Sequence, residues 1–171
     1  HIVVDMQRLF AEKGVWYTPT LNAITPTVAL IVEHRPEQTL LTRFMTPPDS
    51  EQASGTWQRY YQHWRAVTLQ RMDPAKLDLV DALGKFTPPA EVIDKTTHSA
   101  FESPAFLQLL SRRQPDALIF TGVETDVCVL ASVMTAVDRG YRTIVVADAV
   151  TSSSIDAHQA TLDTIFPRFD Q

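Results

Sequence analysis

Short runs of Val, Ile and Leu alternate along this chain with longer stretches of helical periodicity, and this alternation is the strongest constraint on its fold. The apolar runs are expected to form strands at residues 1–5, 39–44, 90–95, 116–122 and 142–148. Helices are expected at residues 21–35, 57–71, 103–113, 126–139 and 154–166. Aliphatic runs separated by helices are typical of a parallel sheet covered on both faces. The sequence therefore predicts a three-layer α/β/α fold with a central, mostly parallel, doubly wound sheet.

The length of the chain fits one domain, which we expect to span residues 1–171 without internal repeats. The fractions of hydrophobic residues (44%) and charged residues (20%) are those of an ordinary globular protein. None of the five glycines forms a G-x-G-x-x-G or a P-loop after a strand. A dinucleotide-binding domain is therefore disfavoured despite the similar layout, and we expect no cofactor.

The charge pattern limits the classes of partner. The formal net charge is −5 and the Lys and Arg residues are scattered, which argues against nucleic acid or an anionic membrane surface. No apolar run approaches the ~20 residues that a membrane-spanning helix needs. A single Cys cannot form an internal disulfide and fits a reducing compartment, so we expect a cytoplasmic protein. With nucleic acid and membrane disfavoured, the expected partner is a small molecule.

Three residues of catalytic type follow three different predicted strands. Asp5 comes directly after "IVV", Lys95 ends the strand at 90–95, and Cys128 follows the strand at 116–122 after a short turn. The carboxyl ends of parallel strands share one edge of a sheet, where ligands bind. A carboxylate that accepts a thiol proton, next to an ammonium, is suited to nucleophilic hydrolysis.

Each of these residues also has a simpler interpretation when it is taken alone. A carboxylate after a strand is commonly a turn or cap residue, and a Lys at a strand end is commonly solvated. A lone Cys in an apolar helix is commonly part of the core. Residue type and position therefore leave the catalytic interpretation open.

Four segments, taken in order, carry a resemblance to a known family: "VVDMQRLF" (3–10), "DKTTHSAF" (94–101), "GVETDVCV" (122–129) and "TIVVADAVTS" (143–152). They resemble the segments that define the isochorismatase-like cysteine hydrolases, which include nicotinamidases and N-carbamoylsarcosine amidases. The resemblance implies the catalytic triad Asp5, Lys95 and Cys128. It also implies a role for Gln7 in the substrate site and places Phe10 at an aromatic wall near the catalytic Asp.

The resemblance further implies the chemistry. The backbone N–H groups of Glu124 and Cys128 would form the oxyanion hole, and the Val123–Glu124 peptide bond would be cis. Cys128 would attack the carbonyl carbon of an amide or carbamoyl group, and the C–N bond would break to release ammonia or an amine and leave a thioester. Lys95 is expected to lower the pKa of the thiol. The family is commonly oligomeric, so we expect a homodimer or homotetramer.

One segment departs from the metal-dependent members of this family. Nicotinamidases carry an Asp-x-His pair after the second strand, whereas this chain reads "TRFMTPPD" at 42–49. The five histidines show no spacing typical of metal ligands, so we expect no metal. Arg43 stands in this segment, and we expect it either to bind a substrate carboxylate or carbonyl, or to form a surface salt bridge.

The segment "WQRYYQHWRAV" at 57–67 is rich in aromatic residues. Trp57, Tyr61 and Trp64 are spaced to lie on one face of a helix. This face is expected either to pack against the core or to form a wall of the substrate pocket, with Trp57 and Tyr61 as candidate substrate-binding residues.

Two other functions remain open at this stage. Isochorismatases of the family cleave a vinyl ether, but they lack a Cys at the position of Cys128, which argues against that activity. A member without catalytic activity could instead bind a metabolite or sense oxidants through Cys128, because accessible thiolates oxidise readily.

Overall fold

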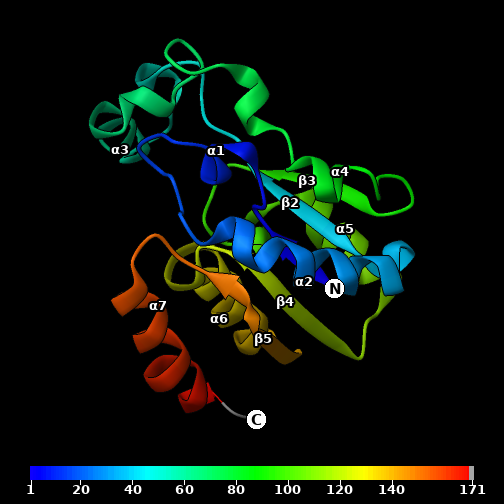
Figure 1. Ribbon diagram of the computed structural model, residues 1–171. Helices are drawn as coiled ribbons and strands as arrows, with labels where there is room; N and C mark the ends of the chain where they lie inside the picture. Colours follow the sequence, from blue (N-terminus) through cyan, green and yellow to red (C-terminus); the bar gives the residue numbers. More distant parts are fainter. Residues whose placement is uncertain (170–171) are drawn as a thin grey trace.

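The computed structural model describes residues 1–169, which form one parallel five-stranded sheet flanked by helices (Figure 1). The strands are β1 (Ile2–Val4), β2 (Leu40–Phe44), β3 (Glu91–Lys95), β4 (Ala117–Val123) and β5 (Arg142–Thr151). They lie in the order β3-β2-β1-β4-β5, and each neighbouring pair is parallel. The predicted α/β fold is confirmed.

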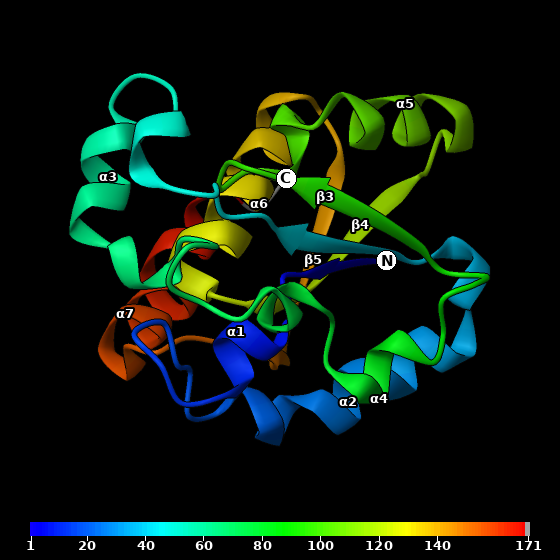
Figure 2. The same ribbon diagram turned by 90° about the horizontal axis from the view of Figure 1, so that it is seen from above.

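Helices cover both faces of the sheet and one of its ends. They are α1 (Arg8–Ala11), α2 (Leu21–His34), α3 (Trp57–His63), α4 (Asp81–Gly84), α5 (Pro104–Arg113), α6 (Leu130–Asp138) and α7 (Ile155–Ala160). Figure 2 shows α2 and α4 on one face of the sheet and α5 and α6 on the other. Helix α3 lies beyond the carboxyl ends of the strands, above the region where the predicted catalytic residues gather.

The helix expected at 154–166 is α-helical only over Ile155–Ala160 and continues as a π-helical turn at Thr161–Ile165. Two other predicted helices differ from the structure at one end. Helix α3 ends at His63 and is followed by a 3₁₀ turn at Arg65–Val67, so it is much shorter than expected. The helix expected at 126–139 begins with a wider π-helical turn at Thr125–Val129 before α6 starts. Both differences fall beside the candidate site, where side-chain contacts decide the path of the backbone.

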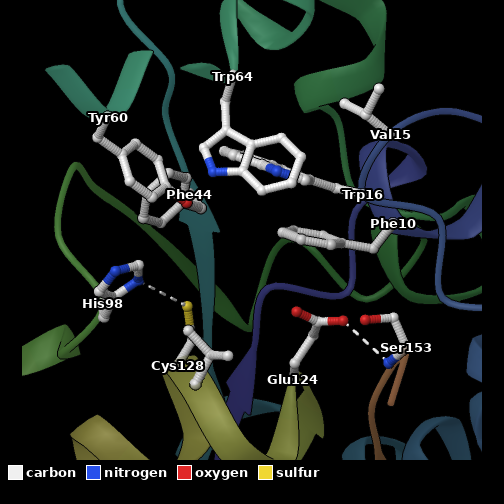
Figure 3. Close-up of a pocket in the computed structure, with 11 residues that line it drawn as sticks. Phe10, Val15, Trp16, Phe44, Tyr60, Trp64, His98, Glu124, Cys128 and Ser153 are labelled. Carbon is white, nitrogen blue, oxygen red and sulfur yellow. Dashed lines mark hydrogen bonds between the residues drawn. The ribbon is translucent and has the colours of Figure 1, made fainter. Parts of the chain in front are cut away.

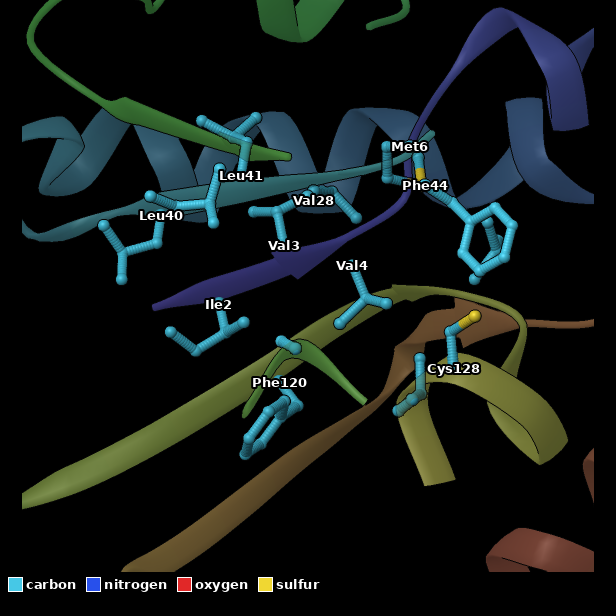
Figure 4. Packing of buried hydrophobic residues seen from close by; sticks show 14 of the residues in the cluster. Ile2, Val3, Val4, Met6, Val28, Leu40, Leu41, Phe44, Phe120 and Cys128 are labelled. Atoms are coloured by element: carbon cyan, nitrogen blue, oxygen red, sulfur yellow. The ribbon is translucent and has the colours of Figure 1, made fainter. Parts of the chain in front are cut away.

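The core lies between the sheet and the helices (Figure 4). Val3 and Val4 of β1 are fully buried, as are Leu41 of β2, Phe120 of β4 and Val28 of α2. Burial of a side chain of this size stabilises the fold by roughly 1.5–3 kcal/mol. Strand β1 lies in the middle of the sheet and is buried on both faces, which explains its uninterrupted aliphatic sequence.

The order of the strands places a switch point between β1 and β4. From β1 the chain adds β2 and β3 on one side, and it then returns to add β4 and β5 on the other. Ligands bind at such a point, at the carboxyl ends of the strands. Gly122 allows the two strands to meet here: its φ is +107°, and a Cβ atom would lie 2.1 Å from the carbonyl oxygen of Val4.

No helix within residues 1–169 combines the length and the apolar character that a membrane span requires.

Candidate active site

A buried ion pair lies at the carboxyl ends of two strands of the sheet. Asp5 follows β1, and Lys95 is the last residue of β3. The Lys95 Nζ atom lies 2.7 Å from Asp5 Oδ2, and both side chains are fully buried. The predicted arrangement of these two residues at one edge of the sheet is therefore present in the structure.

The backbone at Asp5 adopts the left-handed conformation, with φ at +49°. Asp tolerates this region better than most residues, although it still costs about 1–2 kcal/mol. Thr42 of β2 stabilises the turn, because its hydroxyl donates to Asp5 Oδ1 at 2.6 Å and accepts from the Asp5 N–H at 3.2 Å. The carboxylate is thus held by an ammonium and a hydroxyl, and sequence reasoning did not identify Thr42.

Lys95 is held on three sides. Its ammonium donates to the carbonyl of Thr97 at 2.9 Å and lies 4.7 Å from the centre of the Phe44 ring. Burial lowers the pKa of Lys95, but the charges of Asp5 and Cys128 outweigh that effect and leave the pKa raised. Lys95 therefore stays charged at neutral pH.

Cys128 lies in the π-helical turn that follows β4, and only 5% of its surface is exposed. The carbonyl of Glu124 accepts the N–H groups of Val127 and Val129, each at 3.1 Å. These two bonds flank Cys128, whose own N–H is not bound to that carbonyl among the described residues. The Val123–Glu124 peptide bond is cis in the structure.

The thiol of Cys128 is not ionised in advance. Burial raises its pKa above the ordinary value; Lys95 opposes this shift and Asp5 adds to it, and the net direction is upward. Lys95 lowers the pKa of the thiol as expected, but burial raises the pKa by more than Lys95 lowers it. At neutral pH the sulfur therefore carries its proton, and a nucleophilic role would need a base to accept it.

A cavity of about 360 Å³ opens above the sulfur (Figure 3). The thiol points into it from below, and His98 Nδ1 lies 3.8 Å from the sulfur. The cavity is lined by Phe10, Val15, Trp16, Phe44, Tyr60, Trp64, His98, Glu124, Val127, Cys128 and Ser153. Phe10 lines the cavity as the resemblance implied.

Several of these lining residues were not predicted. Phe44 ends β2, so the rule that identified Asp5 and Lys95 at the carboxyl ends of strands would also have found it. Trp16 and Ser153 lie in irregular segments without a periodic pattern. His98 stacks on Phe44, with ring centres 5.9 Å apart, and only the fold brings it to the sulfur.

Gln7 occupies a different place from the one expected. Its side-chain amide donates to the carbonyls of Phe44 and Leu77 at 3.2 and 2.8 Å, and its Oε1 atom accepts the N–H of Phe44 at 2.7 Å. The side chain is fully buried and does not line the cavity. The assignment of Gln7 as a substrate-binding residue is therefore corrected: Gln7 joins three segments that frame the site.

Arg43 also lies outside the cavity. Its guanidinium binds both carboxylate oxygens of Asp94, at 2.7 and 2.9 Å, and lies 3.5 Å from Asp78. Arg43 and Asp94 are opposite each other on β2 and β3. The alternative of a surface salt bridge describes Arg43, and the substrate contact is corrected.

The aromatic helix presents a different pair of rings from the predicted one. Tyr60 and Trp64 line the cavity above Cys128, whereas Trp57 and Tyr61 line a neighbouring cavity of about 390 Å³. Tyr61 is almost fully buried, and its ring stacks on Trp57. Trp57 and Tyr61 therefore support the wall from behind, and their assignment to the substrate-binding surface is corrected.

The side chains of residues 1–169 do not include a group of three or more His, Cys, Asp or Glu that could hold a metal ion. The donor set therefore does not fit a resident metal.

Comparisons with known proteins point to one family. The chain is 30% identical over 162 residues to nicotinamidase 3 of Arabidopsis thaliana, and the match covers 94% of this chain and 77% of that protein. It is 33% identical over 78 residues to maleamate amidohydrolase of Pseudomonas putida, and this match spans only 37% of that protein's length and 46% of this chain.

A solved structure agrees in fold. A cysteine hydrolase from Pseudomonas syringae pv. phaseolicola superimposes with a TM-score of 0.82 at 24% identity, covering 99% of this chain and 85% of that one. The model of the isochorismatase domain matches residues 1–171. Given this match, the parallel sheet and the cysteine at its switch point, the chain belongs to the isochorismatase family.

Proposed function

We propose that this protein is an amidohydrolase that cleaves a C–N bond of a small amide or carbamoyl compound through a thioester on Cys128, without a metal. Two observations together carry the proposal: the fully buried Asp5 and Lys95 side chains form an ion pair that acts on the Cys128 thiol, and this thiol points into a cavity. Buried charges are costly unless paired, and they concentrate at functional sites.

The named relatives support the class of reaction. Both the nicotinamidase and the amidohydrolase are hydrolases of amides by name. The isochorismatase domain by itself is also compatible with hydrolysis of other bonds, but a buried thiol that points into a small cavity favours covalent catalysis.

The first step transfers a proton and forms a bond. Asp5 accepts the proton of the Cys128 thiol while the sulfur attacks the carbonyl carbon of the amide, and the carbonyl oxygen becomes an oxyanion. The raised pKa of the thiol requires this transfer to accompany the attack. Lys95 remains charged and stabilises the negative charge that moves from Asp5 toward the sulfur.

The oxyanion needs preorganised donors. The backbone N–H groups of Glu124 and Cys128 are proposed for this role, since both belong to the turn between β4 and α6. A donor of this type is worth about 2.7–4 kcal/mol in the transition state. The π-helical geometry leaves the N–H of Cys128 outside the hydrogen bonds to the Glu124 carbonyl.

The second half of the reaction regenerates the site. Protonated Asp5 gives its proton to the leaving nitrogen, the C–N bond breaks, and ammonia or an amine departs from the thioester. Asp5 then accepts a proton from water, whose oxygen attacks the thioester carbon. The C–S bond breaks, the acid leaves, and the proton returns to the sulfur.

The experiment is incubation with a panel of small amides, with ammonia release and the mass of the protein as readouts. We expect turnover by the native protein, a transient acyl adduct on Cys128, and no change after treatment with a chelator. Cys128→Ala should lose all turnover and keep the circular dichroism spectrum of the native fold. Full activity of this variant would exclude covalent catalysis. Assembly into a homodimer or homotetramer stays a prediction, to be measured by light scattering in the same samples.

A further inference from the structure

The side chain of Glu124 brings an acidic group into the cavity. Its Oε1 atom accepts the N–H of Ser153 at 2.9 Å and the hydroxyl of Thr18 at 3.3 Å. No hydrogen bond to Oε2 occurs among the described residues, and Figure 3 shows the carboxylate beneath Phe10, with this second oxygen on the side away from Ser153. One oxygen is thus anchored to the protein, and the other is available to a ligand.

This carboxylate has no cationic partner in the cavity. Within residues 1–169 no Lys or Arg lines the cavity, and Lys95 is paired with Asp5 below it. Burial and the charge of Lys95 both lower the pKa of His98, which is therefore neutral at physiological pH. Burial first, and then the charges of Cys128 and Glu124, raise the pKa of Tyr60 to about 12.

The aromatic rings that line the cavity present a negative electrostatic potential, which has the same sign as the charge of Glu124. Phe10 and Trp16 are stacked with ring centres 6.1 Å apart, and Trp16 lies 6.1 Å from Trp64 in an edge contact. The faces of aromatic rings are electronegative and attract cations, most strongly when water is excluded. A carboxylate placed between these rings would meet no Lys or Arg among the residues that line the cavity.

We propose that Glu124 determines the substrate class: the cavity prefers small amides with a flat apolar part and a cationic group, accepts neutral ones, and excludes those that carry a carboxylate. This inference rests on the proposed amide hydrolysis. The flat part would lie against Phe10 and Trp16, and the cationic group would face Glu124 Oε2. The maleamate hydrolase named above takes an anionic amide, so this chain would differ from that relative in substrate charge.

Glu124 could alternatively serve only to join the segments of Thr18 and Ser153. In that case its replacement would weaken the binding of all substrates alike, and the preference for charge would not change. The discriminating quantity is therefore a ratio between substrates, which cancels any general loss of activity.

The test uses three amides of nearly one shape: benzamide, 4-(aminomethyl)benzamide as the cation, and 4-carbamoylbenzoate as the anion. For the native protein we expect kcat/KM of the cation to exceed that of the anion by about 100-fold, since an unfavourable charge contact costs several kcal/mol. In Glu124→Gln this ratio should fall at least about ten-fold. Glu33→Gln on the exposed side of α2 removes the same charge far from the cavity and should keep the native ratio.

Binding to Cys128→Ala separates this inference from the proposed hydrolysis. Quenching of tryptophan fluorescence should give the tightest binding for the cation and the weakest for the anion, and Glu124→Gln in this background should reduce the difference. If the charge order appears in binding without turnover of any amide by the native protein, the hydrolysis fails and this inference stands. Turnover or binding without a charge order, or an order unaffected by Glu124→Gln, overturns it.

Discussion

Two ion pairs involve neighbouring residues of strand β3, and one pair is exposed whereas the other is buried. Asp94 and Lys95 are adjacent on β3. Asp94 points outward and binds Arg43 of β2, in a pair whose side chains are 48% and 26% exposed. Lys95 points inward and binds Asp5, in a pair with no exposed surface. Successive side chains of a strand alternate between its faces, so one step along β3 separates a surface contact from the candidate catalytic centre.

The exposed pair and the buried pair contribute differently to the stability of the fold. An exposed pair gains little, because water screens the charges and two long side chains lose freedom. A buried pair has given up the hydration of both charges, and the loss of either partner leaves the other uncompensated. The Asp5–Lys95 pair is thus a costly arrangement that its proposed role in proton transfer explains, whereas the Arg43–Asp94 pair joins two strands at the surface.

The largest effect should follow from breaking the buried pair. Lys95→Met leaves Asp5 buried without its cation, and we expect the free energy of unfolding to fall by about 3–5 kcal/mol together with a loss of turnover. Urea denaturation measures this change. Asp5→Asn combined with Lys95→Met should recover much of the stability and none of the activity. A loss below about 1 kcal/mol in the single variant would show that the pair is not electrostatically demanding.

A second experiment distinguishes the effects of Asp5 and Lys95 by measuring how fast the Cys128 thiol is alkylated. Asp5 raises the pKa of Cys128 and Lys95 lowers it. A lower pKa gives more thiolate at a fixed pH, so Asp5→Asn should speed alkylation by iodoacetamide at neutral pH, and Lys95→Met should slow it. For the native protein, the raised pKa predicts a rate that still increases above pH 8.5. Equal rates in all three proteins would contradict the electrostatic coupling.

Asp5→Asn provides a further contrast within this experiment. It should increase the reactivity of the sulfur toward iodoacetamide while abolishing amide turnover. Such a separation is expected if Asp5 acts as the base, and it would not occur if Asp5 only adjusted the charge of the thiol.

The smallest effect should follow from breaking the exposed pair. Arg43→Met is expected to change the free energy of unfolding by at most about 1 kcal/mol. It should leave kcat and KM unchanged, because Arg43 does not line the cavity. Urea denaturation and steady-state kinetics on the same samples measure both. A large rise in KM would restore Arg43 as a substrate contact.

Sequence patterns predicted the strands better than the site walls. The runs before Asp5 and Cys128 are buried on both faces of the sheet, and their aliphatic composition reflects this directly. The pattern at 57–71 predicts one helix with Trp57, Tyr61 and Trp64 on one face, whereas α3 ends at His63. Tyr60 and Trp64 line the cavity. Helical spacing no longer fixes the direction of Trp64 once the helix has ended, so packing decides which rings meet the cavity.

Gln7 and Thr42 illustrate the same limit among polar residues. The resemblance implies a substrate ligand at Gln7, yet the whole side-chain amide of Gln7 joins backbone groups. Thr42 was not identified, although it holds the carboxylate of Asp5. A hydrogen bond depends on the position of both partners, and residues far apart in the sequence acquire those positions only when the sheet forms.

By itself, the sequence determined the parallel α/β fold and the delivery of Asp5, Lys95 and Cys128 to one edge of the sheet. These features follow from local periodicity and from the rule that parallel strands end at a common edge. Only the tertiary structure decided that the thiol is buried and protonated, that Glu124 faces an aromatic cavity without a cation, and that Arg43 turns away from it. Burial and charge are properties of what surrounds a residue, and segments distant in the chain provide those surroundings.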